Sequence, residues 1–585
     1  MGREHRWTIA SAPDEALVSR LAADINVSPS IARILIRRGI DTYDRAKDFF
    51  RPSLELLHDP FLMDGMQKAV DRLSHAFSHQ ETIFIFGDYD VDGTNGAAML
   101  YLFIRNMGHP EDKVYYHIPD RIKEGYGLSK PGIDRAKEHD AALMIAVDCG
   151  ITAIEQVAYA RSLGIDVIIC DHHEPGGELP NAYAVLDPLK PGDGYPFKYL
   201  CGAGVAFKFI QGFARSKGKE SDVYQYVDFV TLATTADIVP LIGENRILVK
   251  FGLEQINASP RPGLKALIDG AGLKLGKLSS GQIVFVIVPR NNAVGRLGDA
   301  MRAVKLLTCT DIETARGLAA VLEEENLNRR KIDEETFIHA QELVENFLDM
   351  DNEIAIVLHQ DQWHPGVIGI VASRLVEKYY RPTVMMTTVN GVARGSARSV
   401  VGFDIYQALK RVEDKMLQFG GHKYAAGLAV ELSRLDEFRE AFNMVVKELM
   451  KDELLIREIV IDAEIELGEI TPRFQRLLRE FAPFGPQNQR PVFLARDVEV
   501  LGSPRIVGKN HLRFKARKNG HVFDAIGFGL GDLKDRAKNR VDIVFSIDES
   551  DVPGSQGNGD TFPQLKVKDL RSSEKEAPVA HQISA

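Results

Sequence analysis

The sequence predicts an α/β protein of several domains: a domain with a parallel sheet, a long connecting helix, a second α/β domain and a C-terminal domain of short strands. In the first half, apolar strand-like runs alternate with helical stretches, which is the pattern of a parallel sheet with right-handed crossovers. A long charged helical run follows, and alternating segments separated by turn residues fill the last part of the chain. At roughly 150 residues per domain, the 585 residues correspond to about four folding units.

The parallel-sheet domain is predicted over residues 59–310. Its buried strands are expected at Glu81–Gly87, Ala141–Val147 and Ile165–Cys170, and its first helices over residues 95–107 and 152–163. Each strand is a short apolar run, and each helix stops at or before a glycine.

The rest of the chain divides by its pattern. We expect a helical preface over residues 1–58, a connecting helix over 311–348, a second α/β domain over 349–452, a small β-barrel or sandwich over 453–570 and a disordered tail over 571–585. In the second α/β domain, strands are expected at Ile354–Leu358 and Thr383–Thr387. The three glutamates Glu323–Glu325 are expected on the solvent-exposed face of the connecting helix.

Composition excludes several classes of protein. No apolar run approaches the ~18 residues of a membrane helix; the run Ile283–Val288, for example, has the length of a strand and stops at Pro289. The start of the chain is charged and shows no secretory signal. The four cysteines are widely spaced and form no CxxC pair, which excludes a disulfide scaffold and a thiolate zinc site. We therefore expect a cytoplasmic protein without membrane contact.

Acidic residues and histidines follow three successive strands of the first domain. They are Asp88, Asp90 and Asp92 after the first strand, Asp148 after the second, and Asp171-His172-His173 after the third. Residues at i, i+2 and i+4 of an extended segment share one face, so the first three carboxylates should converge. The carboxyl ends of parallel strands line one crevice, so all three segments should meet there.

So many acidic groups in one crevice would repel one another unless cations offset them. Oxygen ligands mixed with imidazole favour Mn²⁺ or Mg²⁺, and two such ions suit hydrolysis of a phosphoester. Taken alone, Asp148 could cap a helix, and the histidine pair could be structural. A calcium loop starting at Asp88 is disfavoured because its twelfth position is Met99 rather than glutamate.

Several motifs together resemble the DHH phosphoesterase superfamily. They are GDYDVDG at 87–93, VDCG at 147–150, the DHH triplet at 171–173, TADIVP at 235–240 and GGHKYAAG at 420–427. The segments WHPGVIGIVASR at 363–374 and GSARSVVGFDI at 395–405 are similar to the RecJ branch of that superfamily. The resemblance covers essentially residues 40–570.

The resemblance implies a set of site residues. It implies metal ligation by Asp90, Asp92, Asp148, His172 and Asp237, catalytic positions for Asp88 and His173 in or beside that site, and contacts with substrate phosphate from Arg296, Ser396, Arg398 and His422. Two divalent ions, Mn²⁺ or Mg²⁺, are the implied cofactors. One departure is Phe86, which stands where many members carry a histidine, so Asp88 would compensate at the second metal.

Two further segments bear on binding. Gly202-Ala203-Gly204 suggests a dinucleotide motif, but the third glycine of GxGxxG is replaced by Phe207, so helix packing explains it better. Between residues 501 and 520 there are six basic and no acidic residues, among them Arg513 and Lys515, with His511, Phe514 and Phe523 in or near the run. The net charge of −10 argues against a protein that binds nucleic acid with its whole surface but allows a local basic groove. In such a groove we expect the basic side chains to follow the phosphates of a single strand and the aromatic rings to stack on its bases. Taken alone, the run could also be an exposed strand face rich in lysine and arginine. By resemblance, this run lies in an OB-fold.

The resemblance implies a single-stranded-DNA-specific 5′-to-3′ exonuclease that releases 5′-mononucleotides by two-metal-ion hydrolysis, in DNA recombination and repair. It also implies single-strand-binding protein and a RecQ-type helicase as partners, and we expect a monomer. Two alternatives stay open. One is a DHH phosphodiesterase for nano-RNA or cyclic dinucleotides, which would not need the basic β-domain. The other is a catalytically silent single-strand-binding or scaffold protein, which would not need the acidic cluster.

Overall fold

A computed structural model describes residues 5–121, 123–350, 352–550 and 562–573. Within the chain two compact units separate, one of residues 54–456 and the other of residues 1–53 together with 457–585. Most of the tail predicted to be disordered, residues 574–585, lies outside the described residues. In the described ranges, no helix has both the length and the apolar character that crossing a membrane requires.

The larger unit begins with the predicted parallel sheet. Its strands are β2 (Thr82–Gly87), β3 (Val114–His117), β4 (Ala141–Val147), β5 (Asp166–Cys170) and β6 (Ala184–Leu186), in the order β3-β2-β4-β5-β6. All neighbouring strands pair in parallel. All six residues of β2 are buried, as expected for a parallel strand that is covered on both faces.

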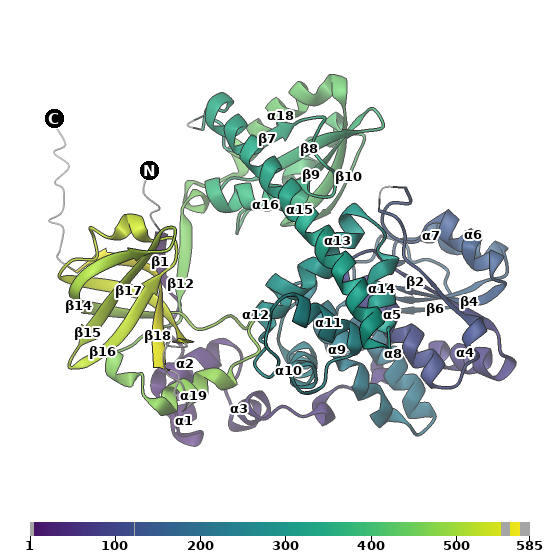
Figure 1. The fold of residues 1–585 in the computed structure, drawn as a ribbon, viewed down its shortest axis with the longest axis horizontal. Coiled ribbons are helices and arrows are strands. Elements are labelled where there is room, and N and C mark those ends of the chain that lie inside the picture. Colours follow the sequence, from purple (N-terminus) through teal and green to yellow (C-terminus); the bar gives the residue numbers. More distant parts are fainter. Residues whose placement is uncertain (1–4, 122, 351, 551–561, 574–585) are drawn as a thin grey trace. The chain divides into compact units, whose positions relative to one another are not determined.

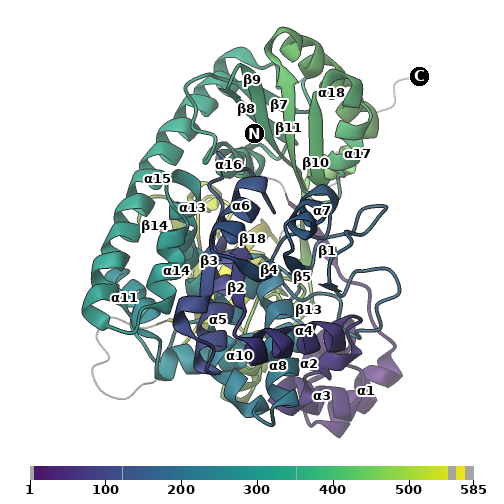
Figure 2. The same cartoon turned by 90° about the vertical axis from the view of Figure 1, so that its right-hand side faces the viewer.

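Helices cover both faces of this sheet. Helices α6 (Lys130–Glu138) and α7 (Ile154–Ser162) pack on the face of Phe84 and Phe86. Helices α4 (Met66–His79), α5 (Val91–Asn106) and α8 (Gly202–Ser216) pack on the opposite face, which carries Ile83 and Ile85. Figure 2 shows α6 and α7 above the strands and α4, α5 and α8 below them. Alternation of side chains along β2 thus supplies both cores.

Further helices extend the first domain. They are α9 (Val227–Ala236), α10 (Gly243–Ala258), α11 (Pro262–Gly270), α12 (Ser280–Gln282), α13 (Val288–Leu297) and α14 (Met301–Thr308). The apolar run Ile283–Val288 has the length of a strand but is helical, because Ile283–Ile287 form a π-helical turn that leads into α13. Pro289 has no N–H to donate to the carbonyl of Phe285, which accounts for the widened turn there.

The predicted long connecting helix is present as α15 (Ile312–Phe347), which has 36 residues. Figure 1 shows it running from α11 and α13 toward the second sheet of the same unit. The prediction that Glu323–Glu325 form a solvent-exposed face was wrong for two of the three residues. Glu323 pairs with Arg290 of α13, and Glu325 lies 3.3 Å from Arg302 of α14. These ion pairs connect α15 to α13 and α14.

The second α/β domain contains a mixed sheet. Its strands are β7 (Ile356–His359), β8 (Thr383–Val389), β9 (Val392–Arg398), β10 (Gln418–His422) and β11 (Ala425–Glu431), in the order β10-β11-β9-β8-β7. Its helices are α16 (Ile368–Tyr379), α17 (Ile405–Lys410) and α18 (Leu435–Leu449). Only β7 and β8 pair in parallel within this sheet.

The smaller unit contains the predicted barrel. Strands β14 (Phe493–Val507), β15 (His511–Lys518), β16 (His521–Gly527), β18 (Phe562–Ser572) and β17 (Arg540–Ser550) form a sheet that closes through pairing of β14 with β17. Around it lie α1 (Glu15–Asp24), α2 (Pro29–Arg37), α3 (Tyr43–Phe50), α19 (Pro472–Glu480), β13 (Ala463–Glu464) and the parallel pair β1 (His5–Ile9) and β12 (Arg457–Ile461). Residues of α1 and α2 share one apolar core with the barrel, which the sequence did not predict.

A buried ion pair holds α8 against α10 in the larger unit. The Lys208 ammonium lies 3.1 Å from Oε1 of Glu244, and both side chains are fully buried. Lys208 also donates to the carbonyl of His58, and Glu244 accepts from the hydroxyl of Tyr195. Removal of one partner from a buried pair leaves an uncompensated charge.

We therefore expect Lys208→Met to destabilise the larger unit by about 3–5 kcal/mol, measured as loss of thermal and proteolytic stability. The double variant Lys208→Met/Glu244→Gln should recover part of this loss. The control is Lys265→Met, which removes an exposed pair with Asp269 and should cost at most about 0.5 kcal/mol. Equal effects of the two single variants would contradict the argument.

Candidate functional site

The carboxyl ends of three neighbouring strands meet at the site. Asp88 follows β2, Asp148 follows β4 and Asp171 follows β5, and β4 lies between the other two strands. Three groups of side chains offer ligand atoms that lie within 4.8 Å of one another: Asp88, Asp90 and Asp148; Asp92, His172 and Asp237; Asp148, His172 and His173. The groups share Asp148 and His172, so they form one continuous cluster.

The geometry of the first motif differs from the extended segment expected from the sequence. Helix α5 begins at Val91, not near residue 95, and Asp90 is its N-cap: Oδ1 accepts from the backbone N–H groups of Asp92 (2.8 Å) and Gly93 (3.2 Å). Asp88 and Asp90 flank a tight turn. The first turn of α5 packs closely against it, since a Cβ on Gly93 would lie 2.3 Å from the Asp88 nitrogen. The three carboxylates converge because Asp88 follows the end of β2, Asp90 caps α5 and Asp92 lies in the first turn of that helix.

Helix α8 holds Asp92 from the other side. The two oxygens of Asp92 accept from the backbone N–H groups of Gly202 (2.6 Å) and Ala203 (2.7 Å), at the start of α8. A Cβ on Gly202 would lie 2.6 Å from Cβ of Asp148, so only glycine allows this approach. Close packing, and not dinucleotide binding, therefore explains the glycines of this segment.

His172 lies at the centre of the cluster. Its Nε2 is 3.2 Å from Oδ1 of Asp148, 3.6 Å from Oδ2 of Asp237 and 3.7 Å from Oδ2 of Asp92. Burial lowers the pKa of His172 to about 4, so the imidazole is neutral near pH 7 and cannot offset these charges. Burial, followed by the neighbouring carboxylates, raises the pKa of Asp148 and Asp237, and raises that of Asp92 to about 6.

These features fit a site for divalent cations. Oδ1 of Asp88 is buried and has no hydrogen-bond partner within the described part of the chain, and burial and Asp90 raise the pKa of this carboxyl. Buried polar atoms normally have partners, so an unpaired carboxylate oxygen within a group of acidic side chains fits a site that binds a cation. Carboxylate oxygens with one neutral imidazole are the donor set that suits Mn²⁺ or Mg²⁺.

Phe86 takes no part in the cluster. Its side chain is fully buried on the sheet face covered by α6, with its ring centroid 5.6 Å from that of His117. Asp88, Asp90 and Asp148 form their group without a histidine. Compensation by Asp88 at a second metal stays a prediction.

The sequence did not assign roles to Asp171 and Tyr126. Oδ1 of Asp171 lies 2.7 Å from Nδ1 of His173, and Oδ2 accepts from the backbone N–H of Ile151. Burial lowers the pKa of His173, but the hydrogen bond and charge of Asp171 outweigh it and raise the pKa to about 9. The Tyr126 hydroxyl lies 3.1 Å from Nε2 of His173. Asp171 was named in the sequence as the first residue of its motif but was given no role; Tyr126 has no signal in the sequence.

A basic cluster lies beside the acidic one. Ser396 and Arg398 are on β9 and His422 ends β10, and Nη1 of Arg398 donates to Oγ of Ser396 (2.8 Å). Arg296 of α13 donates to the carbonyl of Gly366 in the second domain (3.2 Å). Burial, and after it the charges of His173 and Arg398, lower the pKa of His422, so this ring is affected by a residue of each cluster.

Arg121 is a further cation that the sequence did not single out. Its charge acts on Arg296, Arg398 and His364, and its guanidinium lies 5.0 Å from the ring centroid of Tyr89. Burial and the charges of Arg121 and other arginines lower the pKa of Arg296 to about 10. Cations assembled against their mutual repulsion form a site for an anion such as phosphate. An isolated arginine in a loop gives no sequence signal.

Arg513 and Lys515 lie in the smaller unit, on the exposed side of β15. Phe514 alternates with them and is buried in the barrel core, so the expectation that its ring is available for stacking was wrong. Three of the six basic residues in this run are paired with carboxylates from other segments: Arg517 with Glu499 at 2.6 Å, Lys518 with Glu466 at 2.7 Å and, more loosely, Arg513 with Asp524 at 4.0 Å.

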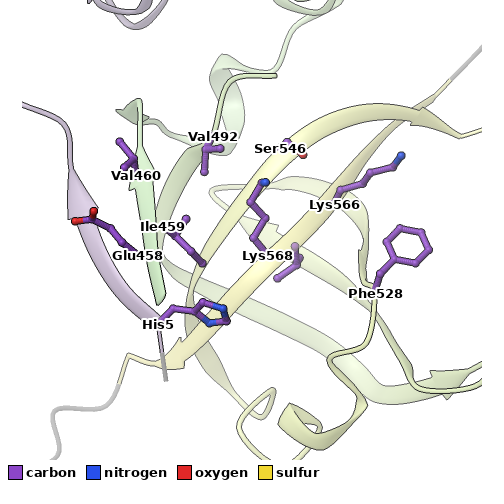
Figure 3. A pocket seen from close by; sticks show the side chains of 10 residues that line it. His5, Glu458, Ile459, Val460, Val492, Phe528, Ser546, Lys566 and Lys568 are labelled. Carbon is purple, nitrogen blue, oxygen red and sulfur yellow. The ribbon is translucent and has the colours of Figure 1, made fainter. Parts of the chain in front are cut away.

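A separate hollow of about 520 Å³ lies on other strands of the smaller unit. Figure 3 shows His5 and Ile459 on one side of it and Lys566 and Phe528 on the other. Lys566 pairs with Asp548, while Lys568 is exposed. The positive charge of its lining is therefore partly neutralised, and the basic side chains of β15 do not line it.

The fold and the site define a phosphoesterase of the DHH class. The sequence matches the DHH family, N-terminal domain, over residues 82–234 and the DHHA1 domain over residues 351–448. It matches the RecJ OB domain over residues 461–569. The order of the three matches is that of the three folded parts described above.

Within this class, the chain belongs to the RecJ family. It is 36% identical over 575 residues to single-stranded-DNA-specific exonuclease RecJ of Bacillus subtilis, covering 97% of this chain and 71% of that protein. It is 34% identical over 562 residues to the RecJ of Salmonella typhimurium, covering 92% and 95%. The crystal structure of RecJ in complex with Mn²⁺ from Thermus thermophilus matches with a TM-score of 0.82 at 30% identity, over 97% of this chain and 80% of that chain. A structure of that protein with Mg²⁺ matches with a TM-score of 0.76 at 29% identity, over 97% and 79%.

The cluster makes a prediction about stability in the presence and absence of metal. Asp148→Asn removes a buried carboxylate from a group of repelling carboxylates, so in EDTA the variant should melt at a higher temperature than the wild type. Mn²⁺ should raise the melting temperature of the wild type, by a stabilisation of about 2.7 kcal/mol at 100 times its Kd. The variant should lose that rise, as measured by calorimetry and thermal unfolding.

Asp228→Asn is the matched control. Asp228 is also buried, but it pairs with Arg261 at 2.6 Å, away from the cluster. This variant should melt at a lower temperature than the wild type in EDTA and still respond to Mn²⁺. An Asp148→Asn variant that is destabilised in EDTA and keeps the full Mn²⁺ response would contradict the metal assignment.

Proposed function

We propose that the chain is a single-stranded-DNA-specific exonuclease that degrades DNA from 5′ to 3′ and releases 5′-mononucleotides, in DNA recombination and repair. The observation that carries this proposal is the acidic cluster around Asp148 and His172, lying beside a cluster of arginines in the same compact unit. The relatives in the RecJ family are named for single-stranded-DNA-specific exonuclease activity. Crystal structures of one of them contain Mn²⁺ or Mg²⁺.

The proposed metal ligands are Asp90, Asp92, Asp148, His172 and Asp237, with Asp88 supporting the position that lacks a histidine at Phe86. Two divalent cations held there would supply an activated water and would stabilise the charge that develops on the phosphoester. The backbone donors to Asp90 and Asp92 keep these carboxylates oriented before the cations bind. Asp171 orients the segment that carries both histidines, because its Oδ1 accepts from the backbone N–H of His172 and lies 2.7 Å from Nδ1 of His173.

His173 is the proposed proton donor. Asp171 keeps its ring protonated near pH 7, because the raised pKa of about 9 lies above that pH. Nδ1 is held by Asp171, so the proton to be delivered is the one on Nε2, which lies 3.1 Å from the hydroxyl of Tyr126. Protonation of the leaving oxygen from Nε2 would assist departure of the nucleotide.

The arginine cluster is the proposed pocket for the terminal 5′-phosphate. Ser396, Arg398, Arg296 and His422 were expected there, and Arg121 joins them. A guanidinium can bind two phosphate oxygens at once, and the Ser396 hydroxyl adds a further donor. A pocket for a terminal phosphate at a fixed distance from the cleavage site would set the polarity of digestion.

The exposed residues Arg513 and Lys515 are proposed to contact the phosphates of the single strand farther from its end, as is common on barrels of this kind. From family membership we further propose a cytoplasmic monomer that works with single-strand-binding protein and a RecQ-type helicase.

Digestion of 3′-labelled single-stranded DNA with a 5′-phosphate tests the activity. The wild type should shorten this substrate in Mn²⁺ or Mg²⁺ but not in EDTA, and should leave duplex DNA and a cyclic dinucleotide intact. Cleavage of the cyclic dinucleotide alone would favour a phosphodiesterase for small nucleotides. Binding of single-stranded DNA without hydrolysis of any substrate would favour a scaffold protein.

The phosphate pocket makes a separate prediction. Arg398→Ala should reduce kcat/KM on 5′-phosphorylated DNA by about 10–100-fold, which corresponds to loss of one charge-assisted contact. The same variant should change kcat/KM on 5′-hydroxyl DNA much less. Arg411→Ala is the control, because Arg411 is an exposed arginine of the same domain that pairs with Glu448. An equal loss on both substrates would contradict a role for Arg398 in binding the terminal phosphate.

A further inference from the structure

The segment after helix α9 contains a strained backbone position. The helix ends at Ala236, Asp237 caps it with φ −79°, and Ile238 has φ +62°. Eleven non-glycine residues of the described ranges have positive φ, and Ile238 is the only β-branched residue among them. Glycine or asparagine normally occupies this position after a helix, because a branched side chain crowds the backbone there.

Packing does not compensate for this strain. Ile238 is 67% exposed, so little of its apolar surface is removed from water. The residues around it are well fixed: Val239 packs against the cluster of Cys201, Ala203 and Ala233, and the Pro240 carbonyl accepts from the side chain of Asn245. The segment therefore holds one exposed apolar side chain in a strained and rigid position.

That position is next to the acidic cluster. The carboxylate of Asp237, the preceding residue, lies 3.6 Å from Nε2 of His172. Strained residues that persist without a structural reason tend to mark places where the chain meets a ligand. Asp237 belongs to the cluster, so a ligand bound there comes close to the neighbouring residue Ile238, whose exposed apolar side chain suits an apolar part of that ligand.

We propose that Ile238 is the apolar contact for the base of the nucleotide whose phosphodiester bond is cut. This inference rests on the proposed exonuclease function and deepens it. Every base has an apolar face, so such a contact tolerates all four bases, in keeping with degradation of arbitrary sequence. Its position beside Asp237 would align the nucleoside while the acidic cluster acts on the phosphate.

The stability of variants separates this role from a structural one. Ile238→Asn and Ile238→Gly relieve the strain and remove only exposed apolar surface, so both should melt at or up to about 3 °C above the wild type. Their affinity for Mn²⁺, measured by calorimetry, should stay within about twofold of the wild type. Gln80→Gly is the control, because Gln80 is an exposed residue with φ +51° at the end of α4. A marked loss of stability or of Mn²⁺ affinity in the Ile238 variants would assign Ile238 to placement of Asp237 and overturn the proposal.

Kinetics on two substrates test the contact itself. On ordinary single-stranded DNA, Ile238→Asn and Ile238→Gly should raise KM and lower kcat/KM by about tenfold. Ile238→Val should lose less than either, and Gln80→Gly should match the wild type. On DNA with an abasic nucleotide at the position to be cut, the wild type should fall to the level of Ile238→Asn, so the difference between them should vanish.

Two results would overturn the inference while leaving the proposed function intact. One is unchanged kcat/KM of Ile238→Asn on ordinary DNA that the wild type degrades. The other is an equal loss on ordinary and abasic DNA, which would show that no base is contacted. A wild type that degrades no single-stranded DNA would overturn the proposed function and this inference with it.

Discussion

The concentration of buried carboxylates at the ends of neighbouring strands is the constraint on which the site depends. Asp88, Asp90, Asp92, Asp148 and Asp237 all offer oxygens to one cluster, where burial and mutual repulsion disfavour the charged forms. Backbone N–H groups offset part of this cost: those of the first turn of α5 bind Asp90, and those at the start of α8 bind Asp92. The remainder is left for cations to offset. The fold thus holds an excess of negative charge at this site, which favours binding of divalent metal ions.

The arginine cluster is an excess of positive charge within the same compact unit. Arg296 comes from α13, Arg398 from β9 and Arg121 from a loop of the parallel-sheet domain, so the cluster exists only if the two domains are held together. Helix α15 supplies that connection, and Glu323 pairs it with Arg290, six positions before Arg296 on α13. Each cluster is unfavourable alone: divalent cations would offset the charge of the acidic cluster, and a phosphate of the bound strand would offset that of the arginines. Binding of substrate and metal should therefore support each other.

Much of this arrangement could be predicted from the sequence, for identifiable reasons. Strands β2 and β4 are apolar runs with a clear end, so the position of Asp88 and Asp148 at strand ends followed from pattern alone. The helix cap at Asp90 was misjudged, because alternating acidic residues suit an extended segment as well as a capped helix. Phe514 was misjudged because a basic strand with one aromatic residue does not show which face is buried. In both cases the local pattern allows two structures, and tertiary packing selects one.

Other features have no local signal at all. Strand β1 pairs with β12, which is far from it in the sequence, and residues of α1 and α2 pack into the core of the barrel. Only the folded chain therefore shows that the N-terminal helical segment is part of the barrel unit. Tyr126 and Arg121 reach the site from loops. Backbone strain is equally hidden: Asp148 with φ +61° and Ile238 with φ +62° look ordinary in the sequence. Aspartate tolerates this conformation far better than isoleucine. At Asp148 this conformation is an acceptable way to direct a carboxylate toward the acidic cluster. At Ile238 neither the residue type nor its packing favours it, and the proposed contact with a base gives a reason for the isoleucine there.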